Sequence, residues 1–233
     1  MKILALDSSG LVASVALVTE DELLAEYTVN YKKTHSQTLL PMLGEIVTMI
    51  GLDLSEIDAI AVSSGPGSFT GLRIGSATAK GLGYALDKPI ISVPTLDALA
   101  YNLYGTDKII CPIMDARRKQ VYTGLYEFNN NDFKVVMKSS ITGIMDIIKE
   151  INNINKEVIF IGDAVPIYKE MIKDNIKPSF SFSPSHLSRQ RAGAVGALSI
   201  DYYKNNKTET SFEHAPVYLR LSQAERELKE KAI

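Results

Sequence analysis

One pattern occurs twice in the 233 residues of this chain. The segments ILALD-SSGL-VASVALV (3–18) and CPIMD-ARRKQ-VYTGLY (111–126) each contain an apolar strand, an aspartate, a short polar turn and a second strand. Later in each half a strand enters a glycine-bearing loop, at 62–65 and at 158–163. The repetition predicts two similar α/β halves that meet near residues 104–108. We therefore expect an N-terminal lobe over 1–104 and a C-terminal lobe over 105–233.

Hydrophobic periodicity predicts a βββαβα order for the first half. The expected strands cover 3–6, 12–18, a stretch from Leu23, 57–62 and 90–93, and the expected helices cover 35–50, about 70–86 and 96–103. Thr34 or Ser36 would cap the first helix and Gly51 would end it. The asparagine run at 129–132 predicts a hairpin tip, and the charged stretch 221–231 predicts a solvated helical tail.

A glycine-rich loop, SSGPGSFTGLRIG, occupies residues 63–75. It lacks the Gly-Lys-Ser/Thr of a P-loop, has Thr70 at the third glycine position of a dinucleotide fingerprint, and fails the nucleophile-elbow pattern because Ser68 directly follows Gly67. Amides at a helix N-terminus suit an anion, whereas glycines equally suit a sharp turn with close packing. Both alternatives stay open for the loop residues Gly65, Pro66, Gly67, Ser68, Thr70 and Arg73.

Small residues recur at every fourth position of the following helix, at Gly71, Gly75, Ala79 and Gly83. They share one face, and each glycine costs about 0.5–1 kcal/mol relative to alanine. This face therefore indicates a close contact with another element. That contact is either internal, against the sheet or a neighbouring helix, or part of a subunit interface shared with the helix over 35–50.

Residues that could perform catalysis or hold a metal are sparse. Asp7 and Asp115 end equivalent strands, where an aspartate can position a metal or a water, or simply form a turn. For Asp115 the role in a turn is favoured, whereas for Asp7 both roles, in a turn or in positioning a metal or water, remain open. The three histidines form no i, i+4 pair, and the single Cys111 excludes an internal disulfide. The basic turn Arg117-Arg118-Lys119 is expected to be a solvated hairpin tip.

Composition limits the partners. The net charge is -2 and the pI is about 6.0, so no basic excess favours direct binding of nucleic acid. Asp7 interrupts the N-terminal apolar run, and no run approaches the ~20 residues of a membrane helix. We expect a cytoplasmic protein without a membrane segment.

Four segments together resemble the TsaB (YeaZ) family: LALDSSG (4–10), THSQTLLP (34–41), SSGPGSFTGLRIG (63–75) and APVYLRLSQAE (215–225). The resemblance runs from Met1 to about Glu225. It implies a two-lobed ASKHA fold, the architecture of actin, hexokinase and Hsp70, and a non-catalytic paralogue of the transferase TsaD. Together with the small ATPase TsaE, such a pair makes threonylcarbamoyladenosine beside the anticodon of tRNA. The transferase holds its metal through an HxxxH pair, whereas Leu39 stands four residues after His35 here.

The resemblance also implies partners and an interface. ATP and metal would belong to the partner subunits, a TsaD-type transferase and a TsaE-type ATPase, and tRNA would bind only through the complex. The family's first two helices pair with the transferase or with a second copy, which would make a homodimer. Carried onto this chain, the interface residues are His35, Leu39, Leu43, Ile46, Gly71, Leu72, Gly75, Ala79, Leu82 and Gly83. Asp7, Ser8 and Ser9 would form a vestigial nucleotide site.

Two other functions are alternatives to this accessory role. An ATP-dependent small-molecule kinase of the same superfamily needs an aspartate base and a phosphate-binding loop in both halves. In the second half only Gly162-Asp163 resembles such a loop, and the match is weak. A metallopeptidase needs the ligand pair that is missing at Leu39.

Overall fold

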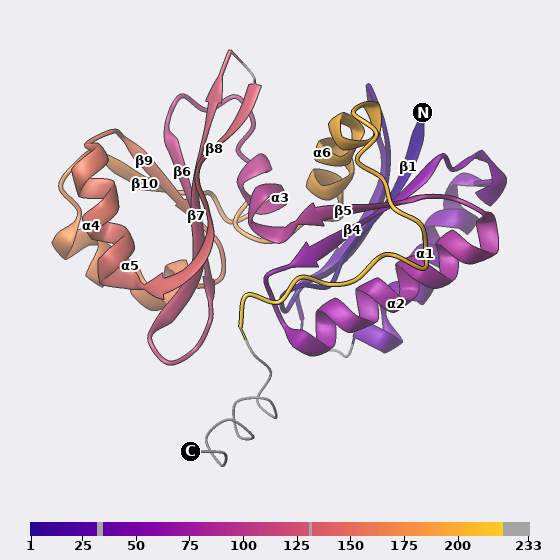
Figure 1. The fold of residues 1–233 in the computed structure, drawn as a ribbon, viewed down its shortest axis with the longest axis horizontal. Helices are drawn as coiled ribbons and strands as arrows, with labels where there is room; N and C mark the ends of the chain where they lie inside the picture. The colour runs from indigo at the N-terminus through magenta and orange to yellow at the C-terminus, as the bar shows by residue number, and fades with distance from the viewer. Residues whose placement is uncertain (32–34, 131, 221–233) are drawn as a thin grey trace.

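The computed structural model describes residues 1–31, 35–130 and 132–220. It contains two five-stranded mixed sheets that lie side by side, with helices around them (Figure 1). The first sheet has the order β3-β2-β1-β4-β5 and the second β10-β9-β6-β7-β8, so β6 to β10 repeat β1 to β5. In each sheet the first three strands form an antiparallel meander and the last two run parallel to the first. The prediction of a duplicated α/β fold is confirmed.

The elements follow one another in the same order in both halves. The first half contains β1 (Lys2–Asp7), β2 (Ala13–Thr19), β3 (Leu23–Val29), α1 (Leu39–Ile50), β4 (Ala59–Gly65), α2 (Phe69–Leu86), β5 (Ile90–Pro94) and α3 (Thr95–Tyr101), with 3-10 turns at His35–Gln37 and Leu54–Glu56. The second half contains β6 (Ile109–Asp115), β7 (Gln120–Asn129), β8 (Asp132–Gly143), α4 (Ile144–Ile154), β9 (Val158–Ile161), α5 (Val165–Asn175), β10 (Phe180–Phe182) and α6 (Ala192–Lys204).

The ends of α1 follow from its sequence, with one correction. Gly51 ends the helix as predicted, in the left-handed conformation (φ 63°). Ser36 does not cap it, because α1 begins at Leu39 and Ser36 lies in the preceding 3-10 turn; Thr34 is outside the described residues. The reason is Pro41, which fits the first turn of a helix but would clash with a carbonyl if the helix began near residue 37.

Two helices are exchanged between the halves. One face of the first sheet is covered by α1 and α2, and its other face packs against α6 of the second half, through Ala192, Val195 and Leu198. In turn α3 of the first half packs against the second sheet, where Leu96 and Leu99 join its core. Both helices lie between the two sheets (Figure 1). The division of the chain at residue 104 stays a prediction.

After α6 the chain returns along the first lobe as a segment without regular structure, residues 208–220, which we call the strap (yellow in Figure 1). Glu209 forms an antiparallel bridge with Ile90 at the edge strand β5, with backbone hydrogen bonds of 2.8 and 2.9 Å. Further on, the Val217 amide donates to the Ser64 carbonyl (2.7 Å). The strap therefore covers one edge of the first sheet and ends beside the second lobe.

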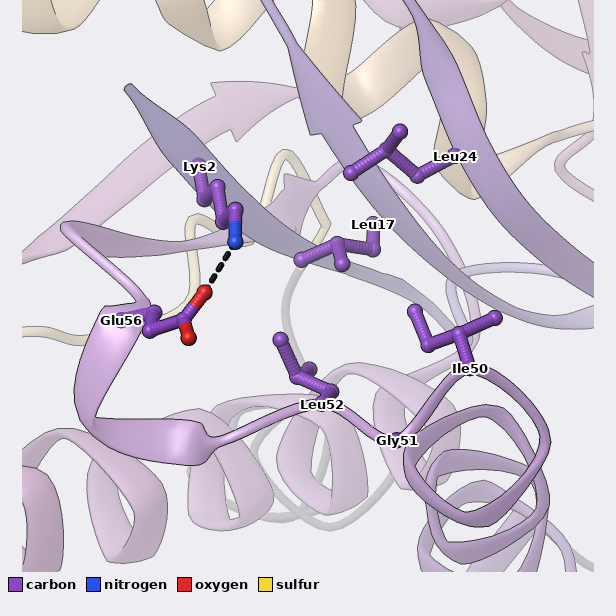
Figure 2. Close-up of a pocket in the computed structure, with 7 residues that line it drawn as sticks. All are labelled: Lys2, Leu17, Leu24, Ile50, Gly51, Leu52 and Glu56. Carbon is purple, nitrogen blue, oxygen red and sulfur yellow. Dashed lines mark hydrogen bonds and ion pairs between the residues drawn. The ribbon is translucent and has the colours of Figure 1, made fainter.

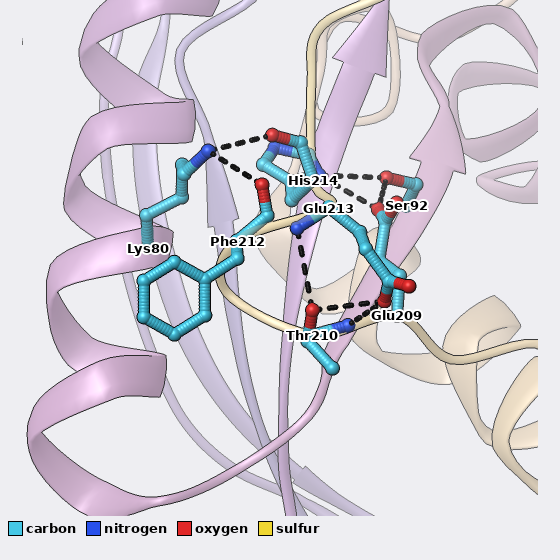
Figure 3. Close-up of polar contacts among 7 residues, drawn as sticks. All are labelled: Lys80, Ser92, Glu209, Thr210, Phe212, Glu213 and His214. Carbon is cyan, nitrogen blue, oxygen red and sulfur yellow. Dashed lines mark hydrogen bonds and ion pairs between the residues drawn. The ribbon is translucent and has the colours of Figure 1, made fainter.

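The buried imidazole of His214 anchors the strap. Its Nδ1 lies 2.7 Å from Glu209 Oε1 and 2.9 Å from Ser92 Oγ on β5. From α2, the Lys80 ammonium donates to the carbonyls of Phe212 and His214, at 3.4 and 2.9 Å (Figure 3). A helix, a strand and the strap are thus joined by one polar cluster.

The hairpin tips agree with the sequence. Asn129 pairs with Asp132 across the tip of β7 and β8, and Arg117, Arg118 and Lys119 are exposed at the tip of β6 and β7. The charged stretch 221–231 lies outside the described residues. Within the described part of the chain, no helix combines the length and apolarity required to cross a membrane.

Candidate functional site between the lobes and on the outer helices

The two repeated strand-turn-strand units face one cleft between the lobes, with a volume of about 690 Å³. Its lining comes from the β1–β2 turn, the glycine-rich loop with the start of α2, the β6–β7 turn and the end of the strap. The lining residues are Ser9, Gly10, Leu11, Gly67, Ser68, Phe69, Thr70, Arg73, Met114, Asp115, Ala116, Arg117, Tyr122, Asp163 and Arg220. The structure therefore brings the predicted loop residues Gly67, Ser68, Thr70 and Arg73 together in the wall of this cleft.

Asp7, the strongest candidate for a catalytic carboxylate, does not line this cleft. It is buried, and its Oδ1 accepts hydrogen bonds from the amide (2.9 Å) and hydroxyl (2.7 Å) of Ser9. Its Oδ2 accepts the hydroxyl proton of Ser63. Burial raises the pKa of Asp7, although these hydrogen bonds oppose the rise. This bonding pattern is that of an aspartate that holds a turn together.

The glycine-rich loop is packed directly against the β1–β2 turn. The Ser68 amide donates to the Ser9 carbonyl (2.7 Å), and the Ser8 hydroxyl donates to the Gly71 carbonyl (2.8 Å). A Cβ at Gly67 would lie 2.2 Å from the Ser9 carbonyl oxygen, and one at Gly71 would lie 2.0 Å from that of Ser8. The contacts therefore support the alternative in which these glycines allow a sharp turn and close packing.

The other loop residues have separate roles. Ser68 is the N-cap of α2, since its hydroxyl accepts from the Gly71 amide at 3.3 Å, so the helix begins at Phe69. Gly65 has a φ of 122°, and a Cβ there would meet the Val217 carbonyl of the strap at 2.2 Å. Pro66 lies in a different hollow, of about 360 Å³, beside Val217.

In the second half the equivalent aspartate also forms a turn. Asp115 is exposed, and its Oδ1 accepts from the Arg117 amide at 2.8 Å. Its own amide donates to Asp163 Oδ1 at 3.0 Å. Burial raises the pKa of Asp163, and this hydrogen bond from the backbone opposes the rise. The turn reading of Asp115 therefore agrees with its contacts.

The small-residue ridge of α2 faces inward. A Cβ at Gly75 would lie 2.5 Å from Ser8 Oγ, one at Gly83 would lie 3.1 Å from the Lys88 carbonyl oxygen, and Ala79 is fully buried. The close contact that the spacing predicts is thus internal, between α2 and its own sheet. This corrects the expectation that the ridge itself approaches a partner, because no partner atom can reach it in the folded lobe.

The remaining interface candidates are also mostly covered by their own lobe. Leu39, Leu43 and Ile46 of α1 and Leu72 of α2 are buried in the core, and Leu82 packs against that core. His35 is half-buried, with Nε2 2.9 Å from the Gly10 carbonyl oxygen. Any contact made by this helix pair must therefore use its opposite, exposed face.

That exposed face contains a second row of small residues, which the sequence analysis missed. Ala77, Gly81 and Ala85 also follow one another at four-residue intervals on α2, and all three are exposed. On the neighbouring helix α1 the exposed row is Leu40, Gly44 and Thr48. A Cβ at Gly44 or Gly81 would meet nothing within 4 Å. We call these six residues, with Met49 and Tyr84, the outer face.

Three large side chains of the outer face are strongly exposed. Met49 is 80% exposed, Tyr84 71% and Leu40 54%. At the C-terminal end of α1 a hollow of about 290 Å³ is lined by the side chains of Leu17, Leu24, Ile50 and Leu52 and by the Lys2–Glu56 ion pair (Figure 2). An exposed apolar surface of this kind is typical of a protein contact.

The described residues offer little for metal or thiol chemistry. Among them, no group of three or more His, Cys, Asp or Glu side chains is placed to hold a metal ion. Leu39, at the position where a ligand pair would need its second histidine, is part of the core. Burial raises the pKa of the Cys111 thiol to about 12, so it stays protonated and unreactive at neutral pH.

Two similar halves, each with the strand order 3-2-1-4-5, and a cleft between their equivalent turns define the ASKHA class. Comparison with known proteins narrows this class. A family model described as "TsaD: tRNA N6-adenosine threonylcarbamoyltransferase" matches residues 22–228. The tRNA threonylcarbamoyladenosine biosynthesis protein TsaB of Bacillus subtilis (strain 168) is 34% identical over 225 residues, which are 97% of this chain and 96% of that protein. The chain belongs to the TsaB family.

Two further comparisons agree. The protein of the same name from Escherichia coli (strain K12) is 29% identical over 230 residues, covering 94% of this chain and 95% of that protein. The solved structure of YeaZ from Pseudomonas aeruginosa superposes with a TM-score of 0.77 at 27% identity, covering 94% of this chain and 99% of that chain. Both similarities extend over both lobes.

Proposed function

We propose that this chain is a non-catalytic subunit of the complex that transfers a threonylcarbamoyl group to N6 of the adenosine beside the anticodon in tRNA. The names of its relatives support a place in this pathway. The observation that carries the accessory role is the outer face of α1 and α2, which is exposed, apolar and lined with small residues. Its occupant is a TsaD-type transferase, or a second copy of this chain when the transferase is absent.

The composition of the outer face suits helix packing. Ala77, Gly81 and Ala85 have little or no side chain, so a partner helix can approach the backbone of α2 closely. Leu40 and Met49 supply apolar area beside that row, and burying such area contributes roughly 25 cal/mol per Å². Small residues set the distance and large ones supply the free energy of association.

The sealed β1–β2 turn supports a non-catalytic role. The Asp7 carboxylate is buried and bonded to Ser9 and Ser63, and the glycine-rich loop closes on the carbonyls of Ser8 and Ser9. The chemistry is therefore assigned to the partners: ATP to a TsaE-type ATPase, and metal and the transfer step to the transferase. tRNA is then the substrate of the whole complex.

A native pull-down of the tagged full chain from its own cells, read by mass spectrometry, tests this proposal. We expect recovery of a related two-lobed protein that carries an HxxxH pair. Gly81→Leu on the outer face should abolish that recovery without lowering the melting temperature, because its side chain would enter open space. The control Glu150→Leu, on the exposed surface of α4, should leave recovery intact.

Two results would contradict the proposal. One is recovery of the chain alone together with ATP turnover on a metabolite, which would favour the kinase alternative. The other is equal recovery of the transferase by Gly81→Leu and the unmodified chain, which would move the contact away from the outer face.

A further inference from the structure

Five cationic side chains from three separate segments gather around the mouth of the interlobe cleft. We call them the cationic rim: Arg73 in the first turns of α2, Arg117, Arg118 and Lys119 on the β6–β7 turn, and Arg220 at the end of the strap. Arg73, Arg117 and Arg220 line the cleft, and Arg118 and Lys119 are exposed on the same turn as Arg117. Only the turn is visible as a basic run in the sequence.

The β6–β7 turn presents its cations on a defined backbone. Arg117, Arg118 and Lys119 have φ angles of 59°, 54° and 60°, all left-handed. The turn is closed by the Gln120 amide donating to the Arg117 carbonyl (3.0 Å), and by the Ala116 amide donating to the Gln120 carbonyl (3.0 Å). Glycine or asparagine adopts this conformation more readily than arginine or lysine does. A turn that only reversed the chain would not need three cations here.

The charges of the rim are not neutralised within the lobes. In residues 1–31, 35–130 and 132–220, none of the five forms an ion pair with a carboxylate. Arg220 donates to the Ala116 carbonyl, and Arg73 donates to the Tyr218 hydroxyl at 3.3 Å. The two carboxylates that line the cleft, Asp115 and Asp163, each accept a backbone amide. Five cations against these two carboxylates make the rim locally positive on a chain whose net charge is -2.

We infer that the cationic rim binds the phosphate backbone of RNA. Five cations spread over three segments match a chain of successive phosphates better than one small anion. Phe69 lines the cleft, and Tyr218 is stacked on it beside Arg73, so aromatic side chains accompany this part of the rim. The inference rests on the proposed function only for the identity of the RNA, which would be the tRNA substrate of the complex.

The test measures binding of an unmodified tRNA transcript to the full chain by fluorescence anisotropy at 50 mM salt. The variant Arg117→Asn/Arg118→Asn/Lys119→Asn removes three charges and keeps residues that tolerate the left-handed turn. The control Lys134→Gln/Lys149→Gln/Lys177→Gln removes three exposed charges elsewhere on the second half. We expect the rim variant to bind at least about tenfold more weakly, with a salt slope reduced by roughly 0.7–0.9 per lost phosphate contact, and the control to bind like the unmodified chain.

Three results would overturn the inference. They are no tRNA binding by the unmodified chain at 50 mM salt, equal loss of binding in the rim variant and the control, and displacement of the tRNA by micromolar ATP, which would indicate a mononucleotide site.

A pull-down with the same rim variant separates this inference from the proposed function. Retained recovery of the transferase with lost RNA binding supports the rim as an RNA contact. Failure of the unmodified chain to recover any transferase contradicts the proposed function and leaves the binding result to decide the rim.

Discussion

The ring of Tyr218 lies flat on the ring of Phe69, with centroids 4.6 Å apart and an interplanar angle of 6°. This contact joins the strap to the first residue of α2. Leu219 follows, half-buried, and packs against the core of the second lobe, and Arg220 donates to the Ala116 carbonyl of the β6–β7 turn. One short segment near the C-terminus thus connects the start of an N-terminal helix to the second lobe.

We predict that Tyr218→Ala lowers the free energy of unfolding by about 1–2 kcal/mol, because it removes the stacked pair and part of the buried area. Hydrogen exchange at the Val217 amide, which is bonded to Ser64, should become faster in the variant. Tyr31→Ala is the control, since Tyr31 is 70% exposed. Equal effects of the two substitutions on chemical denaturation would show that the stack does not hold the strap.

His214 anchors the other end of the strap, and its replacement should be more costly. His214→Ala removes a buried ring bonded to Glu209 and Ser92, and we expect a loss of about 2–3 kcal/mol in the free energy of unfolding. Exchange should also accelerate at the amides of Ile90 and Glu209, whose bridge depends on the same segment. Glu150→Ala, on the exposed surface of α4, is the control. Unchanged hydrogen exchange at the Ile90 amide in His214→Ala would show that the bridge between Ile90 and Glu209 does not depend on the contacts of His214.

The repeat in the sequence predicted two similar α/β halves, because strand, aspartate, turn and strand follow one another in the same order in both, and the family resemblance implied the two-lobed ASKHA arrangement. The exchange of α3 and α6 was not predictable in this way. Both helices are apolar on the side that meets a sheet, and nothing in a local pattern specifies which sheet is covered. That choice depends on packing between residues far apart in the chain, such as Val18 with Gly196.

The candidate site shows the same limit. Two rows of small residues follow α2 at the same spacing, 71-75-79-83 and 77-81-85. Periodicity identifies both rows, but only the position of the sheet decides that the first is buried and the second exposed. Only the basic turn of the cationic rim could be identified from the sequence. Arg73 and Arg220 are 147 residues apart in sequence and reach the rim only in the folded chain.

The two rows of α2 can be distinguished by a pair of glycine substitutions. Gly71→Ala would place a Cβ 2.0 Å from the Ser8 carbonyl oxygen, and we expect it to lower the free energy of unfolding by at least about 2 kcal/mol. Gly81→Ala meets no neighbour and should raise it by about 0.5–1 kcal/mol, because alanine favours the helix more than glycine does. Chemical denaturation of both variants checks the pair. A stabilising Gly71→Ala would contradict the inward orientation of that row.

Asp7 provides a prediction in which stability and function can be separated. Burial raises its pKa in the folded state above that of the unfolded chain, so the folded protein binds the proton more tightly. The corresponding stability is present in full below the unfolded pKa and is lost as the pH rises through the folded pKa. We therefore predict that the free energy of unfolding of the unmodified chain, minus that of Asp7→Asn, decreases as the pH rises above about 4, the ordinary pKa of an aspartate. Asparagine keeps an oxygen for the Ser9 donors, which makes it a conservative replacement.

The same Asp7→Asn variant distinguishes the accessory role from the kinase alternative. If Asp7 only holds the β1–β2 turn, the variant should recover the transferase and support threonylcarbamoyl transfer to tRNA at the rate of the unmodified chain. A kinase would lose ATP turnover, because it would lose its base. If the difference in free energy of unfolding between the unmodified chain and Asp7→Asn does not change with pH, Asp7 has the same proton affinity in the folded and unfolded states. If the variant forms the complex but transfer is lost, the Asp7 carboxylate takes part in the chemistry. The pH dependence of stability and the activity of the variant thus test separately whether Asp7 only holds the β1–β2 turn.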